Sequence, residues 1–159
     1  MGDESDQVPE LTHLDTQGRA HMVDVGHKPP VRRTAMARGD LVAAPETLDR
    51  LLAGNLPKGE ALAVARIAGI AAAKRTDDLI PLCHSLPLDQ VSVQFERHAP
   101  DRLRVRATVS VTARTGVEME ALVAVSIACL TLYDMGKAVD KLMRIDQVVL
   151  EQKHKEGAT

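Results

Sequence analysis

The segment from Thr115 to Lys141 constrains the fold of this chain more than any other. It contains no proline, and Thr115 is followed three residues later by Glu118. That spacing is the pattern of a capping box, which satisfies free amides at the start of a helix. Residues 121–133 carry no charge, so the segment predicts one long helix that is buried on nearly all sides.

The charged residues of this segment lie along one strip of the predicted helix. At about 100° per residue, Glu120, Asp134, Lys137 and Lys141 fall within one arc. Glu120 and Asp134 are nevertheless about 21 Å apart along the axis, so the same helix cannot bring both to one small ligand. An antiparallel helix from a second subunit would bring the two ends together. A surface pair between Asp134 and Lys137 is the ordinary alternative.

The composition predicts one domain with an aliphatic core. The chain has 159 residues, and its aromatic side chains are one Phe and one Tyr, with no Trp. Because aliphatic side chains bury modest area each, self-association is an attractive source of further burial. With 20 basic and 22 acidic residues, the chain lacks the basic surface and the aromatic platform typical of nucleic-acid-binding proteins.

The N-terminus and the cysteines predict a cytoplasmic protein. Residues 1–10 are acidic and polar, unlike a secretory signal, and we expect them to be disordered. The longest uncharged apolar run has about thirteen residues, which is too short to span a bilayer. Cys83 and Cys129 form no disulfide framework and suit a reducing compartment. We expect no membrane association, a single domain over 11–153 and a flexible tail over 154–159.

Periodicity along the rest of the chain predicts four strands and two further helices. We expect helices over 45–53, where Pro45 suits the first helical position, and over 60–75, where Gly69 suits close packing against a neighbour. Alternation of apolar and polar residues predicts strands over 31–43, 91–98, 103–113 and 143–151. The link between the second and third strands is short enough for a hairpin. This order predicts an α+β, ferredoxin-like fold (split βαβ), with an antiparallel four-stranded sheet and helices on one face.

The segment from Lys74 to Leu88 carries the densest group of reactive side chains. Cys83 and His84 lie there in an apolar loop bounded by prolines. A metal site with His21 lacks the usual ligand spacing, and a Cys–His nucleophile is unsupported because adjacent residues rarely point at one another. A buried cysteine beside a hydrogen-bonded histidine is the ordinary alternative.

Cationic side chains predict an anion site despite the net charge of −2. Lys58 stands near the start of the second predicted helix, a position that suits a phosphate as well as a solvated turn. The further cations that could neutralise such an anion are Arg66, Lys74, Lys137 and Lys141. No P-loop or GxGxxG motif is present, so the residue pattern leads to an oligomeric α+β protein with a candidate anion site.

Four stretches, taken in order, resemble the cyclic pyranopterin monophosphate synthase (MoaC) family: LTHLDTQGRAHMVDV, LPKGEALAVARIAGIAAAKRTDDLIPLCHSL, TGVEMEAL and LYDMGKAVDK. The resemblance covers roughly residues 11–150 and is specific in the combination of ARIAGI, IPLCH and TGVEMEAL. It implies a homohexamer, built as a trimer of dimers, with active sites at the dimer interfaces. It also implies a lyase of molybdenum cofactor biosynthesis. The enzyme would convert 3′,8-cyclo-7,8-dihydroguanosine 5′-triphosphate to cyclic pyranopterin monophosphate and release pyrophosphate.

The matching motifs also imply the site residues. Asp134 and Lys137 of LYDMGKAV and Lys58 of PKG match the catalytic residues of the family. Glu118 is adjacent to the matched set, but the capping box already explains it. The residues expected to bind substrate are Leu82, Cys83, His84, Met119, Glu120 and Asp24 by their motifs, Arg66 and Lys74 as cations, and Lys153 from a shortened basic tail. We expect no metal site and no resident cofactor, and it stays open whether Mg²⁺ accompanies the triphosphate.

Two functions follow from these residues. A carboxylate–lysine pair can act as base and acid in ring opening, provided that neighbouring cations or burial shift the lysine pKa down. Cations near the α-phosphorus would stabilise the charge that leaves with pyrophosphate. The alternative is a ligand-binding regulatory module of ferredoxin-like fold, without catalysis. Clustering of Asp134, Lys137 and Lys58 around one anionic ligand would distinguish the enzyme. Asp77 and Ser85 depart from the family pattern.

Overall fold

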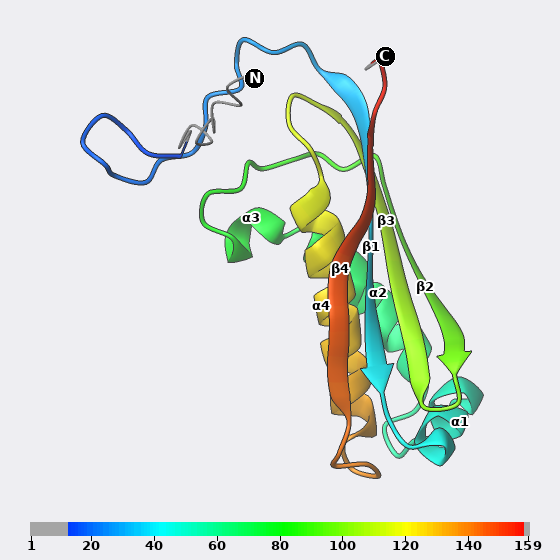
Figure 1. Ribbon diagram of the computed structural model, residues 1–159. Helices are drawn as coiled ribbons and strands as arrows, with labels where there is room; N and C mark the ends of the chain where they lie inside the picture. Colours follow the sequence, from blue (N-terminus) through cyan, green and yellow to red (C-terminus); the bar gives the residue numbers. More distant parts are fainter. Residues whose placement is uncertain (1–12, 158–159) are drawn as a thin grey trace, which may run out of the picture.

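The computed structural model describes residues 13–157, and a four-stranded antiparallel sheet with helices on one face dominates it (Figure 1). In chain order the elements are β1 (Val31–Val42), α1 (Pro45–Ala53), α2 (Ala61–Ala73), α3 (Thr76–Leu79), β2 (Gln90–Ala99), β3 (Arg102–Ala113), α4 (Glu118–Gly136) and β4 (Arg144–Lys155). The strand order is β2-β3-β1-β4, so the predicted ferredoxin-like fold is confirmed. Residues 1–10, expected to be disordered, lie outside the described residues.

Helix α1 begins and ends where local sequence dictates. Pro45 takes the first helical position, where its missing amide costs no hydrogen bond. Gly54 follows the helix with a φ of 69°, and its amide donates to the carbonyl oxygens of Arg50 and Leu51. A left-handed residue at this position favours glycine, because other side chains are strained there. The predicted helix over 45–53 is confirmed.

Helix α4 is shorter than predicted, and the expected capping box does not form. The helix runs from Glu118 to Gly136, its N-cap residue is Val117, and no side chain makes a capping hydrogen bond. The Glu118 carboxylate instead lies 3.4 Å from the ammonium of Lys153 in β4. A partner distant in the sequence of the same chain therefore replaces the local capping partner that the sequence pattern suggested.

The expectation that α4 is buried on nearly all sides is wrong for its outer face. The face toward the sheet is fully enclosed, but Leu130 is 53% exposed. Ile127, one turn earlier, is half-buried. The reason is architectural, because α4 and α2 form a single layer of helices on the sheet (Figure 1). A helix in the outer layer of a two-layer fold keeps one face open.

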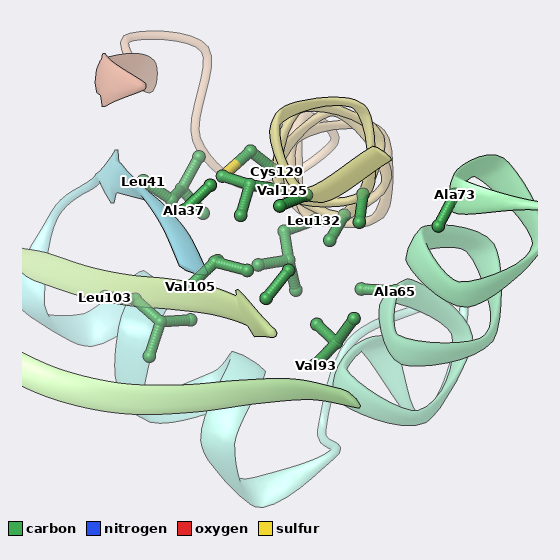
Figure 2. Packing of buried hydrophobic residues seen from close by; sticks show 14 of the residues in the cluster. Ala37, Leu41, Ala65, Ala73, Val93, Leu103, Val105, Val125, Cys129 and Leu132 are labelled. Atoms are coloured by element: carbon green, nitrogen blue, oxygen red, sulfur yellow. The ribbon is translucent and has the colours of Figure 1, made fainter. Parts of the chain in front are cut away.

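The core lies between the sheet and the two long helices, and its side chains are small and aliphatic (Figure 2). Leu41, Val105, Val125 and Leu132 are fully buried there. Cys129 is also completely buried, and the apolar surroundings raise its pKa to about 12. It behaves as a small apolar side chain rather than as a reactive thiol.

Gly69 of α2 marks the close contact between α2 and α4. A Cβ atom at this position would lie 2.9 Å from the main-chain oxygen of Ala124 in α4. We expect Gly69→Ala to lower the free energy of unfolding by about 1–3 kcal/mol, because overpacking outweighs the gain in helix propensity. Denaturant unfolding measures the change. Ala71→Gly, at an exposed position of the same helix, should cost only about 0.5–1 kcal/mol. Unchanged or raised stability of Gly69→Ala would contradict the close packing.

The strands form the predicted hairpin and extend further than predicted at the C-terminus. β2 and β3 are joined through Pro100 and Asp101, and they pair from Gln90 opposite Ser110 to Ala99 opposite Arg102, with a register shift between Arg97 and Ala99. β4 continues to Lys155, and Lys155 pairs with Arg33 of β1. Residues 154 and 155, which we expected to be part of a flexible tail, therefore belong to the sheet.

Helix α4 is long and apolar enough to cross a membrane, by length and composition alone, which the thirteen-residue run did not suggest. However, 56% of its most apolar window is buried inside the fold. It packs on β1, β3 and β4 and against α2. We therefore assign α4 as the core helix of the sheet.

The face of the sheet opposite the helices carries a network of arginines and carboxylates. Asp40 of β1 is 0% exposed, and Arg104 of β3 donates to it through Nε at 2.9 Å and Nη2 at 3.0 Å. Arg102 adds a third hydrogen bond at 3.0 Å. Burial by itself would raise the pKa of Asp40, but the hydrogen bonds from Arg104 and Arg102 hold that pKa below its usual value.

Candidate active site

Three charged residues meet at the C-terminal end of α4. The Asp134 carboxylate lies between two ammonium groups, with Lys58 Nζ 2.7 Å from Oδ2 and Lys137 Nζ 2.7 Å from Oδ1. Lys58 Nζ also donates to the main-chain oxygen of Asp134 at 3.1 Å. The three residues expected to be catalytic are therefore in direct contact, although Lys58 is 76 residues from Asp134 along the chain.

Local structure explains how the cluster is placed. Asp134 is in the last turn of α4 and Lys137 is the residue that follows the helix, so the two face the same side. Lys58 is in the turn between α1 and α2, which Gly59 closes with a φ of 90° and a hydrogen bond from its amide to Leu56 O. Carbonyl groups at a helix C-terminus favour cations and disfavour a carboxylate. The two lysines compensate for the unfavourable position of Asp134.

The two ammonium groups lower the pKa of Asp134 to about 2, through the hydrogen bonds from Lys137 first and Lys58 second. The same contact with Asp134 raises the pKa of Lys137. We expected a catalytic lysine with a lowered pKa, and for Lys137 this expectation is wrong. Its nearest charged partner is a carboxylate, and the hydrogen bond and charge of Asp134 raise the pKa of Lys137 more than desolvation lowers it. At neutral pH Asp134 is therefore a carboxylate, and Lys137 is an ammonium group that can donate a proton.

A cavity of about 340 Å³ opens at the other end of α4, around its first turn. Five of the residues that we expected to bind substrate line it: Leu82, Cys83, His84, Met119 and Glu120. The loop before β2 supplies the first three, and α4 supplies the last two. The segment before β1 contributes His13, Val23, Val25 and Lys28 to the lining, and His84 Nε2 lies 2.8 Å from the main-chain oxygen of Val23. This hydrogen bond ties the N-terminal segment to the cavity.

Glu120 is the buried acid of this cavity. It is 4% exposed, and burial raises the pKa of its carboxyl group, with the neighbouring Glu118 and Asp77 adding to the effect. Burial also raises the pKa of the Cys83 thiol, and the negative charge of Glu120 adds to that shift. A buried carboxyl group with a raised pKa is a candidate acid for a reaction in this cavity.

The raised pKa of Glu120 predicts a pH-dependent effect on stability. Folding raises this pKa above its unfolded value of 4.5, so the buried group costs stability at higher pH, where it must ionise, and costs nothing where it is protonated in both states. We expect Glu120→Gln to raise Tm at about pH 8, and the gain to disappear toward about pH 4. Thermal unfolding across this range measures the difference. Glu118→Gln removes an ion pair with Lys153 and one of the charges that raise the pKa of Glu120, so it should give a smaller gain at about pH 8 than Glu120→Gln.

The other residues expected to bind substrate are more dispersed. Lys153 lines a second cavity of about 290 Å³, which shares Gly116 and Glu118 with the first cavity. Asp24 is exposed and its Oδ1 accepts a hydrogen bond from the amide of Gly26 at 2.8 Å. Lys74 lines a separate cavity beside β2.

Arg66 does not join either group within one chain. Its guanidinium lies over the ring of Phe95 in β2, 5.3 Å from the ring centroid, and its Nε donates to Val93 O. The sequence indicated correctly that Arg66 is a cation of α2, but not which side of α2 it occupies. α2 turns this position toward the edge strand β2.

Sequence reasoning missed several residues of the two cavities. Glu118 lines both, but the capping-box interpretation had set it aside. The TGVEMEAL stretch contains Glu118, so the motif itself was the signal that could have found it. Arg33 and Lys28, which line the second and the first cavity respectively, lie outside the matching stretches and became visible only through the fold.

The two groups of residues lie at opposite ends of one helix (Figure 1). Fourteen residues separate Glu120 from Asp134, which corresponds to about 21 Å along the axis of α4. Among residues 13–157, no group of three or more His, Cys, Asp or Glu side chains is arranged to hold a metal ion. The arrangement therefore provides a carboxylate between two cations at one end and a cavity with a buried acid at the other.

The family model described as "MoaC family" matches residues 22–156. A protein of Herpetosiphon aurantiacus is 62% identical over 144 residues, which cover 90% of this chain and 88% of the relative. A protein of Chloroflexus aurantiacus is 61% identical over 142 residues, or 89% and 87% of the two chains. A protein of Mycobacterium bovis is 55% identical over 148 residues, or 93% and 87%.

The first two relatives carry the name cyclic pyranopterin monophosphate synthase, and the third carries the name cyclic pyranopterin monophosphate synthase 1. The matched range in this chain runs from the segment before β1 to the end of β4. It therefore includes the Lys58–Asp134–Lys137 cluster and almost the whole lining of the cavity around Glu120. On this match, and on the identity to these relatives, the chain belongs to the MoaC family.

Proposed function

We propose that this chain is a cyclic pyranopterin monophosphate synthase, a lyase of molybdenum cofactor biosynthesis. It converts 3′,8-cyclo-7,8-dihydroguanosine 5′-triphosphate to cyclic pyranopterin monophosphate and releases pyrophosphate. The observation that carries the proposal is the contact of Asp134 with both Lys58 and Lys137, in a chain 55–62% identical to relatives of that name. The alternative, a regulatory module without catalysis, needs no such carboxylate–lysine cluster.

The cluster suits the charge and proton movements of this reaction. Closure of the cyclic phosphate requires a sugar hydroxyl to attack the α-phosphorus while pyrophosphate leaves with added negative charge. Ammonium groups of Lys58 and Lys137 would stabilise that charge. Asp134, ionised because its pKa is about 2, would accept a proton or hold the two lysines in place, and Lys137 would donate one.

We propose further that each site is built by two chains. The cavity of about 340 Å³ lies near the lower end of the range of ligand pockets, about 300–1,000 Å³. The Lys58–Asp134–Lys137 cluster lies outside this cavity, so one chain alone does not bring both groups to one substrate. Antiparallel pairing of two copies of α4 would set the cavity of one copy beside the Lys58–Asp134–Lys137 cluster of the other, and close the gap of about 21 Å.

Exposed apolar side chains on the helix layer support this pairing. Leu130 of α4 is 53% exposed, and Ile67 of α2 is 69% exposed. Val64 and Met119 add further apolar surface on the same two helices. Exposed apolar side chains of this kind on one helix layer favour a protein partner. We propose a cytoplasmic homo-oligomer, a hexamer built as a trimer of dimers, with Mg²⁺ entering only with the triphosphate.

Incubation of the purified protein with the cyclised guanosine triphosphate intermediate tests the activity. We expect release of one pyrophosphate per substrate and the appearance of a pterin, detected by its fluorescence after oxidation. Binding of the intermediate without pyrophosphate release would favour the regulatory module and contradict the proposed enzyme.

A further inference from the structure

A third cavity lies at the edge of the sheet, and its lining is rich in guanidinium groups. Its volume is about 300 Å³, and its walls are Arg66 of α2, Gln94, Phe95 and Glu96 of β2, and Arg104 and Arg106 of β3. It shares no lining residue with the cavity around Glu120, and it contains none of Lys58, Asp134 and Lys137. The proposed reaction therefore leaves its chemistry unexplained.

Arg66 is held at the cavity with its terminal amino groups unused. Its Nε donates to Val93 O at 3.2 Å, and the guanidinium lies over Phe95. These two contacts fix the plane of the group. Within residues 13–157, no hydrogen bond or ion pair involves Nη1 or Nη2 of Arg66, and no carboxylate pairs with it.

The other two arginines each keep one free amino group. Arg104 uses Nε and Nη2 on Asp40, which leaves Nη1 without a bond in the described part of the chain. Arg106 uses Nε on Glu151 and Nη1 on Glu96, which leaves Nη2 in the same condition. Asp40, which is fully buried, and the more exposed Glu151 and Glu96 thus orient the two guanidinium groups without using all their donors.

The charge of the lining is positive. The lining holds three arginines and one carboxylate, Glu96. Asp40 and Glu151 pair with Arg104 and Arg106 from outside the lining, so the charge without a carboxylate partner in the described residues is that of Arg66. Guanidinium groups present planar pairs of N–H donors that match the oxygens of phosphate and carboxylate groups. The volume of about 300 Å³ has room for a small oxyanion.

We propose that this cavity is a second anion site, separate from the substrate site, that binds a small phosphate-type oxyanion between Arg66, Arg104 and Arg106. The anion would bridge α2 to β3 across the edge strand β2. Such a bridge would link the helix layer to the open face of the sheet. The oxyanion is either free phosphate or diphosphate, or the phosphate end of a nucleotide.

Calorimetric titration of the full chain with inorganic phosphate at low ionic strength tests the proposal. The double variant Lys58→Met/Lys137→Met removes binding at the other cluster, and we expect it to keep one phosphate site per chain. Adding Arg66→Gln to this variant should weaken the remaining site by about tenfold or more, the size of one lost charge-assisted contact. Arg75→Gln is the matched control, because Arg75 pairs with Asp78 at the end of α2 and does not line the cavity.

Glu96→Gln gives a change of opposite sign. It removes the only carboxylate of the lining and weakens the hold on Nη1 of Arg106, so phosphate should bind more tightly than in the parent. No phosphate binding in the Lys58→Met/Lys137→Met variant would overturn the proposal. So would equal affinity of the Arg66→Gln and Arg75→Gln variants, or weaker binding in Glu96→Gln. Titration with diphosphate and with a nucleoside triphosphate distinguishes the two sources of the oxyanion. Equal affinity for the two ligands identifies the free oxyanion, whereas tighter binding of the nucleotide assigns the site to the phosphate end of a nucleotide.

Discussion

Asp134→Asn is expected to lower turnover of the cyclised guanosine triphosphate by about 10²- to 10⁴-fold while leaving the fold intact. The amide keeps the shape of the side chain but carries no charge, so it can neither accept a proton nor hold two ammonium groups close together. Lys137→Ala should have an effect of similar size, because it removes a proton donor and a cation. Steady-state release of pyrophosphate measures both changes, and circular dichroism with thermal unfolding checks the fold.

Asp78→Asn is the matched control for this prediction. Asp78 also pairs with a basic residue three positions away, Arg75, and both partners are exposed. Exposed pairs of this kind contribute little to stability. Turnover by Asp78→Asn should therefore stay within about twofold of the parent. Near-normal turnover by Asp134→Asn would show that the cluster at the end of α4 is an ordinary surface pair.

Asp40→Ala is expected to lower the free energy of unfolding by about 3 kcal/mol, because it leaves the largely buried guanidinium groups of Arg104 and Arg102 without their carboxylate partner. Denaturant unfolding measures the loss. The folded-state pKa of Asp40 is below its unfolded value of 3.8, so this stabilisation is present above pH 3.8 and is lost as the pH falls through the folded pKa.

Asp146→Ala provides the control for Asp40. Asp146 lies opposite Asp40 in the β1–β4 pairing, but it pairs only with Arg144, which is largely exposed. We expect a cost below about 1 kcal/mol. Equal costs for the two variants would mean that the arginines find other partners when Asp40 is removed, and that the network on the open face contributes little.

Local patterns in the sequence predicted the elements of the fold well. Pro45 and Gly54 delimit α1, and alternation defines the β2–β3 hairpin, because backbone preference and side-chain period act over a few residues. Local patterns did not predict contacts between residues that are far apart in the sequence. Glu118 has the spacing of a cap, yet its partner is Lys153 in β4. Only tertiary structure decides between two such partners.

The candidate site was predicted in part, for a related reason. The spacing of Asp134 and Lys137 predicts their contact, whereas Lys58 reached the predicted site through family resemblance. Arg66 shows where both routes stop. Its charge is plain in the sequence, but the rotation of α2 about its own axis places it on Phe95. Close packing of Gly69 against Ala124 fixes this rotation. The sequence suggests that Gly69 packs closely, but not which neighbouring element it packs against.

A subunit-mixing experiment tests the central claim, that the two ends of α4 act together across two chains. Glu120→Ala and Asp134→Asn damage opposite ends of the helix. In a mixed dimer one site receives both damaged ends and the other receives both intact ends. Random exchange should therefore restore about one quarter of parental activity, while each variant alone stays inactive.

A second mixture makes the result specific. Asp134→Asn and Lys58→Ala damage the same end, so every site in their mixed dimers keeps one damaged cluster, and activity should not recover. The account thus predicts recovery in the first mixture and none in the second, once exchange of differently tagged subunits has been demonstrated. Exchange without recovery in the first mixture would show that each chain builds its own site and would contradict the account.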